Sequence, residues 1–216
     1  MLDNMRLIIF DLDDTLIRSN IDFRGMKKQL LDLFKKEDLP TNKETFPPIS
    51  ELLEILKDKY PEKVEKAFFV IQTLEEAAIE KAEVFPLAEK IPEFLQKKNI
   101  RHCILTNNTR KTVEKYLTTQ KFKFLRSFFI LTRDDVNNMK PHPEGIHKVM
   151  KFMQREDPQI NETNTIYIGD AIIDSRASNE AGIEFLLFNS RNIDEKALET
   201  PPFTKISSWD DFFQLF

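Results

Sequence analysis

Acidic side chains follow two apolar stretches of this sequence, at the point where each stretch ends. Asp11 and Asp13 come directly after residues 6–10, and Asp170 follows residues 165–168. Short apolar runs of this kind are typical of buried strands in a parallel sheet. Ligands bind at the carboxyl ends of the strands in open α/β sheets. We therefore expect these carboxylates to converge, and their oxygen atoms are ligands that suit Mg²⁺.

A hydroxyl group, an amide and an amine are expected at the same edge. Thr106 and Asn107 follow the apolar residues 102–105, and Lys140 lies in a loop after a weaker apolar stretch at 128–131. The ammonium group can neutralise phosphate charge. The hydroxyl and nearby backbone amides can hold phosphate oxygens. Three carboxylates, a hydroxyl and one lysine thus suit a magnesium-assisted reaction of a phosphoryl group.

The elements that must position these residues alternate between strand and helix. A fifth apolar stretch lies at 184–188. Helical patterns separate the stretches, at residues 90–98, 110–120, 143–154 and 172–181. Gly182 is placed to end the last of these helices. This alternation predicts an α/β fold with a central parallel sheet.

Residues 18–84 interrupt the alternation. They contain no convincing strand, and several prolines punctuate three helical patterns, at 23–36, 49–59 and 61–81. We interpret this segment as an all-helical insertion after the first strand. The catalytic core would then comprise residues 1–17 and 85–216. The alternative is one long crossover connection.

The composition excludes several classes of protein. The chain has 216 residues, a net charge of −4 and a pI of about 5.6, so it lacks the basic footprint of a nucleic-acid-binding protein. Its only cysteine, Cys103, cannot form an intramolecular disulfide. No apolar run approaches the length of a membrane span, and the start lacks the pattern of a secretory signal. We therefore expect a cytoplasmic protein without membrane or nucleic-acid partners. Its oligomeric state is not indicated.

Four short motifs together resemble those of the haloacid dehalogenase (HAD) superfamily. The motifs are Asp11-Leu12-Asp13-Asp14-Thr15, Thr106, Lys140, and Gly169-Asp170 with Asp174. They occur in the family's order across residues 6–188, and the helical insertion falls where the family's C1 cap belongs. The layout is similar to the phosphoglycolate phosphatase-like branch. The resemblance implies a Rossmann-like, three-layer core with a helical C1 cap.

The resemblance also implies roles for the acidic residues. Asp11 would be the nucleophile that forms an aspartyl-phosphate, and Asp13 would be the general acid and then the general base. Asp170 would bind Mg²⁺ together with Asp11 and the backbone carbonyl of Asp13. Asp174, placed by a helix on the same face as Asp170, would bind the metal through water or orient Lys140.

The remaining positions would bind the phosphoryl group. Thr106 would hydrogen-bond to it, Lys140 would neutralise it, and Asn107 would contribute its backbone amide or contact the substrate. Asp14 departs from the family, since many relatives carry glycine there.

An aspartate at position 13 favours phosphate esters, because the family's dehalogenases and phosphonatases do not use one there. We therefore expect a Mg²⁺-dependent phosphatase acting on a small phosphorylated metabolite. A phosphomutase of the same branch would use the same residues and stays an alternative. A phosphorylated receiver domain also combines aspartates, threonine and lysine on a parallel sheet. A catalytically silent binding protein is a third possibility.

Overall fold

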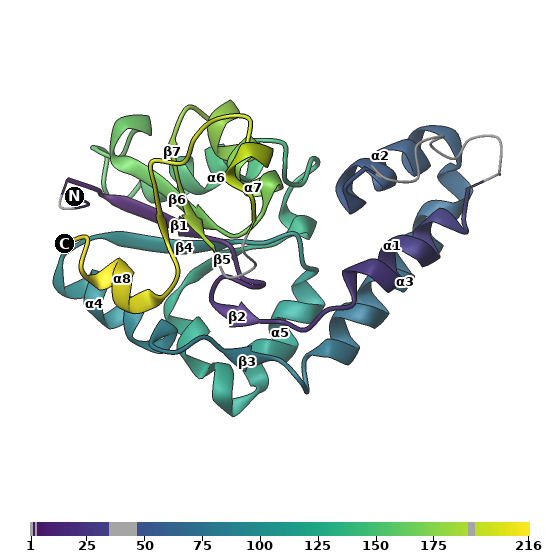
Figure 1. Cartoon of the computed structure of the whole chain (residues 1–216), viewed down its shortest axis with the longest axis horizontal. Helices are drawn as coiled ribbons and strands as arrows, with labels where there is room; N and C mark the ends of the chain where they lie inside the picture. Colours follow the sequence, from purple (N-terminus) through teal and green to yellow (C-terminus); the bar gives the residue numbers. More distant parts are fainter. Residues whose placement is uncertain (1, 3, 35–46, 190–192) are drawn as a thin grey trace. The chain divides into compact units, whose positions relative to one another are not determined.

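The chain forms two compact units in the computed structural model, which describes residues 2, 4–34, 47–189 and 193–216 (Figure 1). The first unit comprises Met1–Ser19 and Ala82–Phe216, and the second comprises Asn20–Lys81. Two short antiparallel strands, β2 (Ile17–Arg18) and β3 (Glu83–Val84), belong to the first unit. The helical interpretation of residues 18–84 did not include these strands.

A six-stranded parallel sheet forms the centre of the first unit, in the order β5-β4-β1-β6-β7-β8. The strands are β1 (Leu7–Phe10), β4 (Arg101–Leu105), β5 (Phe129–Leu131), β6 (Thr165–Gly169), β7 (Glu184–Phe188) and β8 (Thr204–Ile206). Phe10 is in register with Ile104 on one side and Ile168 on the other. The three central strands therefore end at the same level. The predicted parallel α/β fold is confirmed, and β8 is an addition to it.

Helices cover both faces of the sheet (Figure 1). One face packs against α6 (Glu144–Met153) and α7 (Ile172–Glu180), and the opposite side carries α4 (Ile91–Lys97) and α8 (Trp209–Phe213). Side chains of a strand alternate between faces. Leu7 and Ile9 accordingly join the apolar cluster under α6 and α7, whereas the Phe10 ring contacts Trp209 and Phe212. The core is buried on both sides, as a parallel sheet requires.

Shorter elements complete the first unit. The helix α5 (Arg110–Thr118) follows β4 and begins at the N-cap Thr109, whose side chain accepts from the Thr112 backbone N–H at 3.0 Å. The 3-10 helices are Ala88–Lys90, Gln120–Ser127, Arg133–Asp135, Glu162–Asn164 and Glu195–Ala197. Gly182 follows α7 with a φ of 71°, the left-handed conformation expected of a residue that ends a helix.

The second unit is built from α1 (Phe23–Leu31), α2 (Ile49–Lys59), a 3-10 turn (Pro61–Lys63) and α3 (Val64–Ala78). The three α-helices contact one another. They bury an apolar set of their own, namely Met26, Leu30, Leu52, Leu53, Leu56, Ala67 and Ile71. The predicted first helix was longer, and its last residues, 35–36, lie outside the described residues. Within the described part of the chain, no helix is long and apolar enough to cross a membrane.

Candidate active site

Asp11, Thr106 and Asp170 directly follow the central strands β1, β4 and β6. The Asp11 N–H donates to the Ile168 carbonyl at 2.9 Å, and the Thr106 N–H donates to the Leu131 carbonyl at 3.0 Å. The backbone ladder of the sheet therefore holds these residues in place. All three are buried. The expected convergence at the carboxyl edge follows from the common level at which the strands end.

Lys140 connects the end of β1, the middle of β6 and the first turn of α7 through its ammonium group. Its Nζ donates to Asp11 Oδ1 at 2.5 Å, to Asp174 Oδ1 at 2.7 Å and to the Tyr167 hydroxyl at 2.7 Å. An ammonium group has three N–H donors, and each has one acceptor here. The Tyr167 hydroxyl in turn donates to the Leu105 carbonyl at 3.0 Å. Because Lys140 is only 3% exposed, this network is shielded from water.

The carboxylates outnumber the nearby cation. Oxygen atoms of Asp11, Asp170 and Asp174 lie within 4.8 Å of one another, and all three residues are buried. Burial raises the pKa of Asp11 to about 6; Lys140 opposes this rise and Asp174 adds to it. Burial, with repulsion from Asp11 and Asp174, also raises the pKa of Asp170 well above its ordinary value. The site thus holds excess negative charge that a bound divalent cation would offset.

Lys140 itself stays protonated. Burial acts to lower its pKa, but attraction to Asp11 and Asp174 outweighs burial and raises the pKa above its ordinary value. One permanent positive charge therefore faces three carboxylates. This donor set of clustered oxygen atoms fits a hard divalent cation.

Asp174 has two contacts that fix its position. Its Oδ2 accepts from the Ala171 N–H at 3.1 Å while its Oδ1 accepts from Lys140. A Cβ at Gly169 would come within 2.5 Å of Asp174 Oδ2, so glycine leaves room for this carboxylate. The expectation that one helix carries both acids was wrong, because α7 begins at Ile172 and Asp170 precedes it. The two acids meet through a turn rather than along a helix face.

Asp13 lies just outside the lysine network and is half-buried. Its Oδ2 accepts from Asn108 Nδ2 at 2.6 Å. The backbone N–H of Asn108 donates to Thr106 Oγ1 at 3.1 Å. Sequence reasoning did not identify Asn108 or Tyr167. The signal for Asn108 was its place directly after two predicted site residues, whereas Tyr167 lies inside an apolar strand.

Asn107 turns its side chain toward the backbone of Lys140. Asn107 Nδ2 donates to the Lys140 carbonyl at 2.9 Å, and Asn107 Oδ1 accepts from the Lys140 N–H at 3.0 Å. The amide therefore fixes the loop that carries the lysine. A contact of the Asn107 backbone amide with the phosphoryl group, or of Asn107 with the substrate, stays a prediction.

The loop after β1 is held from several sides. Asp14 has a φ of 54°, a left-handed conformation that aspartate tolerates better than most side chains and that glycine adopts freely. The Asp14 carboxylate accepts from the Ser19 N–H at 3.2 Å. Trp209 Nε1 donates to the Thr15 carbonyl at 3.2 Å. These contacts restrict the segment that contains Asp13.

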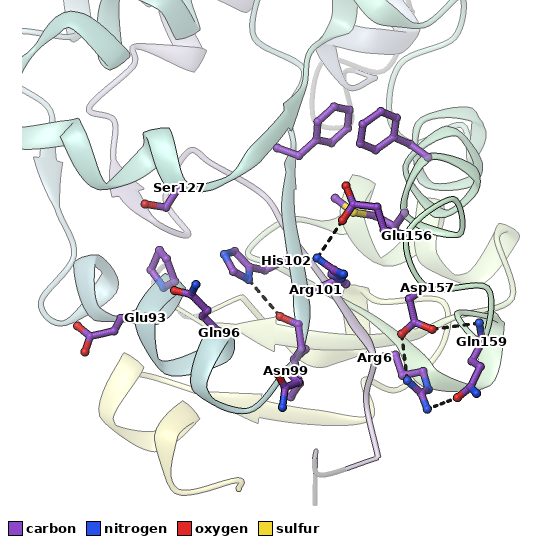
Figure 2. A pocket seen from close by; sticks show the side chains of 15 residues that line it. Arg6, Glu93, Gln96, Asn99, Arg101, His102, Ser127, Glu156, Asp157 and Gln159 are labelled. Atoms are coloured by element: carbon purple, nitrogen blue, oxygen red, sulfur yellow. Dashed lines mark hydrogen bonds and ion pairs between the residues drawn. The ribbon is translucent and has the colours of Figure 1, made fainter.

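A cavity of about 1140 Å³ lies at the opposite, amino-terminal end of the central strands (Figure 2). Its arginines are already paired: Arg6 with Asp157 at 3.0 Å and Arg101 with Glu156 at 2.9 Å. These pairs leave little charge to attract a phosphate. The cavity lies away from the acidic cluster, and we assign the chemistry to the cluster.

Known proteins resemble this chain over most of its length. The sequence profile described as "Haloacid dehalogenase-like hydrolase" matches residues 8–188. An Arabidopsis thaliana protein named for a haloacid dehalogenase-like hydrolase domain is 26% identical over 175 residues, which are 80% of this chain and 66% of that protein. The pyrophosphatase PpaX of Oceanobacillus iheyensis is 30% identical over 194 residues, 84% of this chain and 82% of that protein. A solved hydrolase from Pseudomonas syringae has a TM-score of 0.74 at 23% identity and covers 98% of this chain and 97% of its own, a likeness in fold.

Proposed function

Because the chain belongs to the haloacid dehalogenase-like hydrolase family, we propose that it is a Mg²⁺-dependent phosphatase that uses Asp11 as its nucleophile. The family predicted from the four motifs is confirmed, and with it the assignment of the chain to the hydrolases. The observation that carries the proposal is the buried cluster of Asp11, Asp170 and Asp174 around Lys140. Burying such a cluster costs stability, and clusters of this kind are typical of functional sites.

The first proposed step transfers the phosphoryl group to the enzyme. A carboxylate oxygen of Asp11 attacks phosphorus, and the bond between phosphorus and the leaving oxygen breaks. The carboxyl group of Asp13 gives its proton to that oxygen, so the product leaves as an alcohol. Asp11 now carries an aspartyl-phosphate, and Asp13 is a carboxylate.

The second proposed step returns the enzyme to its starting state. Asp13 takes a proton from a water molecule as the water oxygen attacks phosphorus. The acyl phosphate bond breaks, and Asp11 is released as a carboxylate with free phosphate as the second product. The proton gained by Asp13 is the one that it donates in the next cycle.

The other site residues are proposed to bind Mg²⁺ and the phosphoryl group. Asp11, Asp170, Asp174 and the backbone carbonyl of Asp13 are the groups proposed to hold Mg²⁺, directly or through water. When bound, Mg²⁺ offsets the negative charge of carboxylates and phosphate. Lys140 supplies a second, permanent positive charge beside Asp11. The Thr106 hydroxyl accepts from Asn108, which leaves its own proton available for a phosphoryl oxygen.

We infer that the substrate is a small phosphorylated compound. Pyrophosphate is one candidate, because pyrophosphatases are among the named relatives. A phosphomutase would use the same nucleophile and acid, and formation of a sugar 6-phosphate from a sugar 1-phosphate would identify it. A receiver domain would not turn over a phosphate ester repeatedly. A binding protein would not form a phosphoenzyme.

We also propose that the helical unit, residues 20–81, acts as a cap that governs substrate choice. It carries exposed cations such as Arg24 and has an apolar core of its own. Charge reversal at Arg24 should alter the ranking of anionic substrates while leaving aspartyl-phosphate formation intact. An unchanged ranking across charge reversals throughout the unit would contradict this role.

The central experiment separates the two proposed functions of Asp13. An alkoxide leaving group needs a proton, whereas p-nitrophenolate is weakly basic and leaves nearly unaided. Asp13→Asn should therefore slow phosphoenzyme formation from an alkyl phosphate by about 10²–10⁴-fold and from p-nitrophenyl phosphate far less. With the aryl ester, a burst near one nitrophenolate per site should precede slow turnover. Asp11→Asn should abolish the burst.

Rapid-quench kinetics in Mg²⁺ with trapping of the acid-stable or borohydride-reduced phosphoenzyme would measure both steps. Equal losses for the two esters, without a burst, would remove Asp13 from the proton transfer. A full burst in Asp11→Asn would remove Asp11 as the nucleophile.

A further inference from the structure

The Asn108 side chain contacts the proposed acid–base residue directly. Its Nδ2 donates to Asp13 Oδ2 at 2.6 Å, a short distance for an amide donor. Hydrogen bonds to a charged acceptor are shorter and stronger than neutral ones. The contact joins residues 95 positions apart in the sequence, one on the loop after β1 and one on the loop after β4.

The backbone of Asn108 is itself held at both ends. Its N–H donates to Thr106 Oγ1 at 3.1 Å, and its carbonyl accepts from the Arg133 N–H at 3.2 Å. The residue is 4% exposed. Asn108 is therefore a rigid support, built on the sheet edge, whose amide group is directed at the Asp13 carboxyl.

The Asp13 side chain is more exposed than the buried carboxylates of Asp11, Asp170 and Asp174. It is half-buried and follows the strand by three positions, next to a residue with a positive φ. A carboxyl group that transfers a proton must stay within hydrogen-bond reach of the reacting oxygen. Misplacement by about 1 Å can cost about 100-fold in rate.

We propose that Asn108 is the positioning residue for proton transfer, and that it decides which oxygen of Asp13 carries the proton. The inference rests on the proposed function of Asp13. An N–H donor at Oδ2 uses a lone pair of that oxygen, which favours Oδ2 as the carbonyl oxygen of the protonated acid. The transferable proton then resides on Oδ1. In the first step Oδ1 gives this proton to the leaving oxygen, and in the second step Oδ1 recovers one from water.

Asn107 provides a matched control within the same loop. Its side chain is chemically identical but bonds to the backbone of Lys140. Replacing Asn107 should disturb the lysine loop, which serves both esters equally. Replacing Asn108 should disturb proton transfer, which matters only where the leaving group is basic. The two neighbours therefore have different expected signatures.

The test compares Asn108→Ala with Asn107→Ala in rapid-quench assays with glycerol 2-phosphate and p-nitrophenyl phosphate. For Asn108→Ala we expect phosphoenzyme formation from the alkyl ester to slow by about 10–100-fold. The burst rate with the aryl ester should change by less than about three-fold, followed by slower steady turnover because water activation also suffers. KM for the alkyl ester should stay within about two-fold. Asn107→Ala should slow phosphoenzyme formation from the two esters by the same factor.

The outcomes separate this inference from the proposed function. Asn108→Ala could slow phosphoenzyme formation from both esters by the same factor while the effect of Asp13→Asn still depends on the leaving group. In that case Asn108 has only a structural role, and the proposal is overturned. If Asp13→Asn itself shows no such dependence, the proposed function fails first. Thermal unfolding of each variant checks the fold. Should Asn108→Ala not fold, Asn108→Gln, whose amide is displaced by one methylene, must show the same dependence on the ester or the proposal is refuted.

Discussion

Asp11→Asn should stabilise the metal-free protein at neutral pH, although it destroys the proposed nucleophile. The Asp11 carboxylate is buried beside two other carboxylates and shares one lysine with Asp174. Its pKa is raised from 3.8 to about 6, with burial as the largest cause. Asparagine has nearly the same shape and carries no charge. The substitution therefore removes an electrostatic cost while the packing changes little.

The size of the effect follows from proton linkage. The native state binds the Asp11 proton more tightly than the unfolded state, so stability falls as pH rises from about 4 to about 6. Each unit of pKa corresponds to about 1.4 kcal/mol, so a rise from 3.8 to about 6 costs about 3 kcal/mol once the pH exceeds both values. Below about pH 4 the cost disappears, because the carboxyl group is protonated in both states.

Urea and thermal unfolding in EDTA would measure this difference. At pH 7.5 the variant should exceed the wild type by about 3 kcal/mol, equivalent to roughly 6–12 °C in Tm for a chain of this size. At pH 4.5 the difference should shrink to about 1 kcal/mol. Asp210→Asn, a change at an exposed acid in the first turn of α8, is the control and should shift stability little at either pH.

Magnesium should reduce or reverse the difference in stability between Asp11→Asn and the wild type. A cation that binds only the native state adds stability in proportion to its affinity, and the wild type has the fuller ligand set. The difference in unfolding free energy between the variant and the wild type at pH 7.5 should therefore narrow or change sign as Mg²⁺ is added. If Asp11→Asn lowers stability in EDTA at pH 7.5, then Lys140 already compensates the buried charge, and the reasoning about excess negative charge is wrong.

Three further outcomes follow from the site. Tyr167→Phe removes one of the three acceptors of Lys140 and should lower kcat/KM by about ten-fold with an intact fold, measured by steady-state assays and circular dichroism. Gly169→Ala places a methyl group against Asp174 and should cost about 1–3 kcal/mol in urea unfolding; a neutral result would mean that the turn can widen. EDTA should abolish activity and Mg²⁺ restore it, with Ca²⁺ a poor substitute because its coordination is larger and looser; full activity in excess EDTA would exclude a metal.

The strand-end residues could be predicted from the sequence because a parallel sheet leaves little freedom there. Asp11, Thr106 and Asp170 each follow a short apolar run, and buried parallel strands are continuous apolar runs. Once the strands are adjacent and in register, their first polar residues must meet. Lys140 is different, since a lone lysine in a loop carries no such constraint, and its assignment depended on the resemblance to a family.

The C-terminal strand β8 and helix α8 could not be predicted in the same way. Thr204–Ile206 is a three-residue edge strand without an apolar run, and its pairing with β7 decides its conformation. Trp209 then packs on Phe188, with ring centroids 4.7 Å apart, and bonds to the loop after β1. Edge pairing and aromatic packing of this kind depend on segments far apart in the chain.

The role of Tyr167 was not predicted from the sequence, although the hydrogen-bonding capacity of Lys140 implies a residue of this kind. In the sequence it is one more large side chain in a buried strand, and its ring does pack there. Yet a lysine assigned to a buried site brings three N–H donors, and each must find an acceptor or incur a cost. The predicted carboxylates Asp11 and Asp174 account for two of them. The third N–H donor requires another acceptor close to the site. The central residue of β6 is Tyr167, whose side chain is long enough to bring a hydroxyl oxygen to the lysine. A count of the N–H donors on the buried lysine therefore predicts an oxygen acceptor on β6, and the Tyr167 hydroxyl provides it.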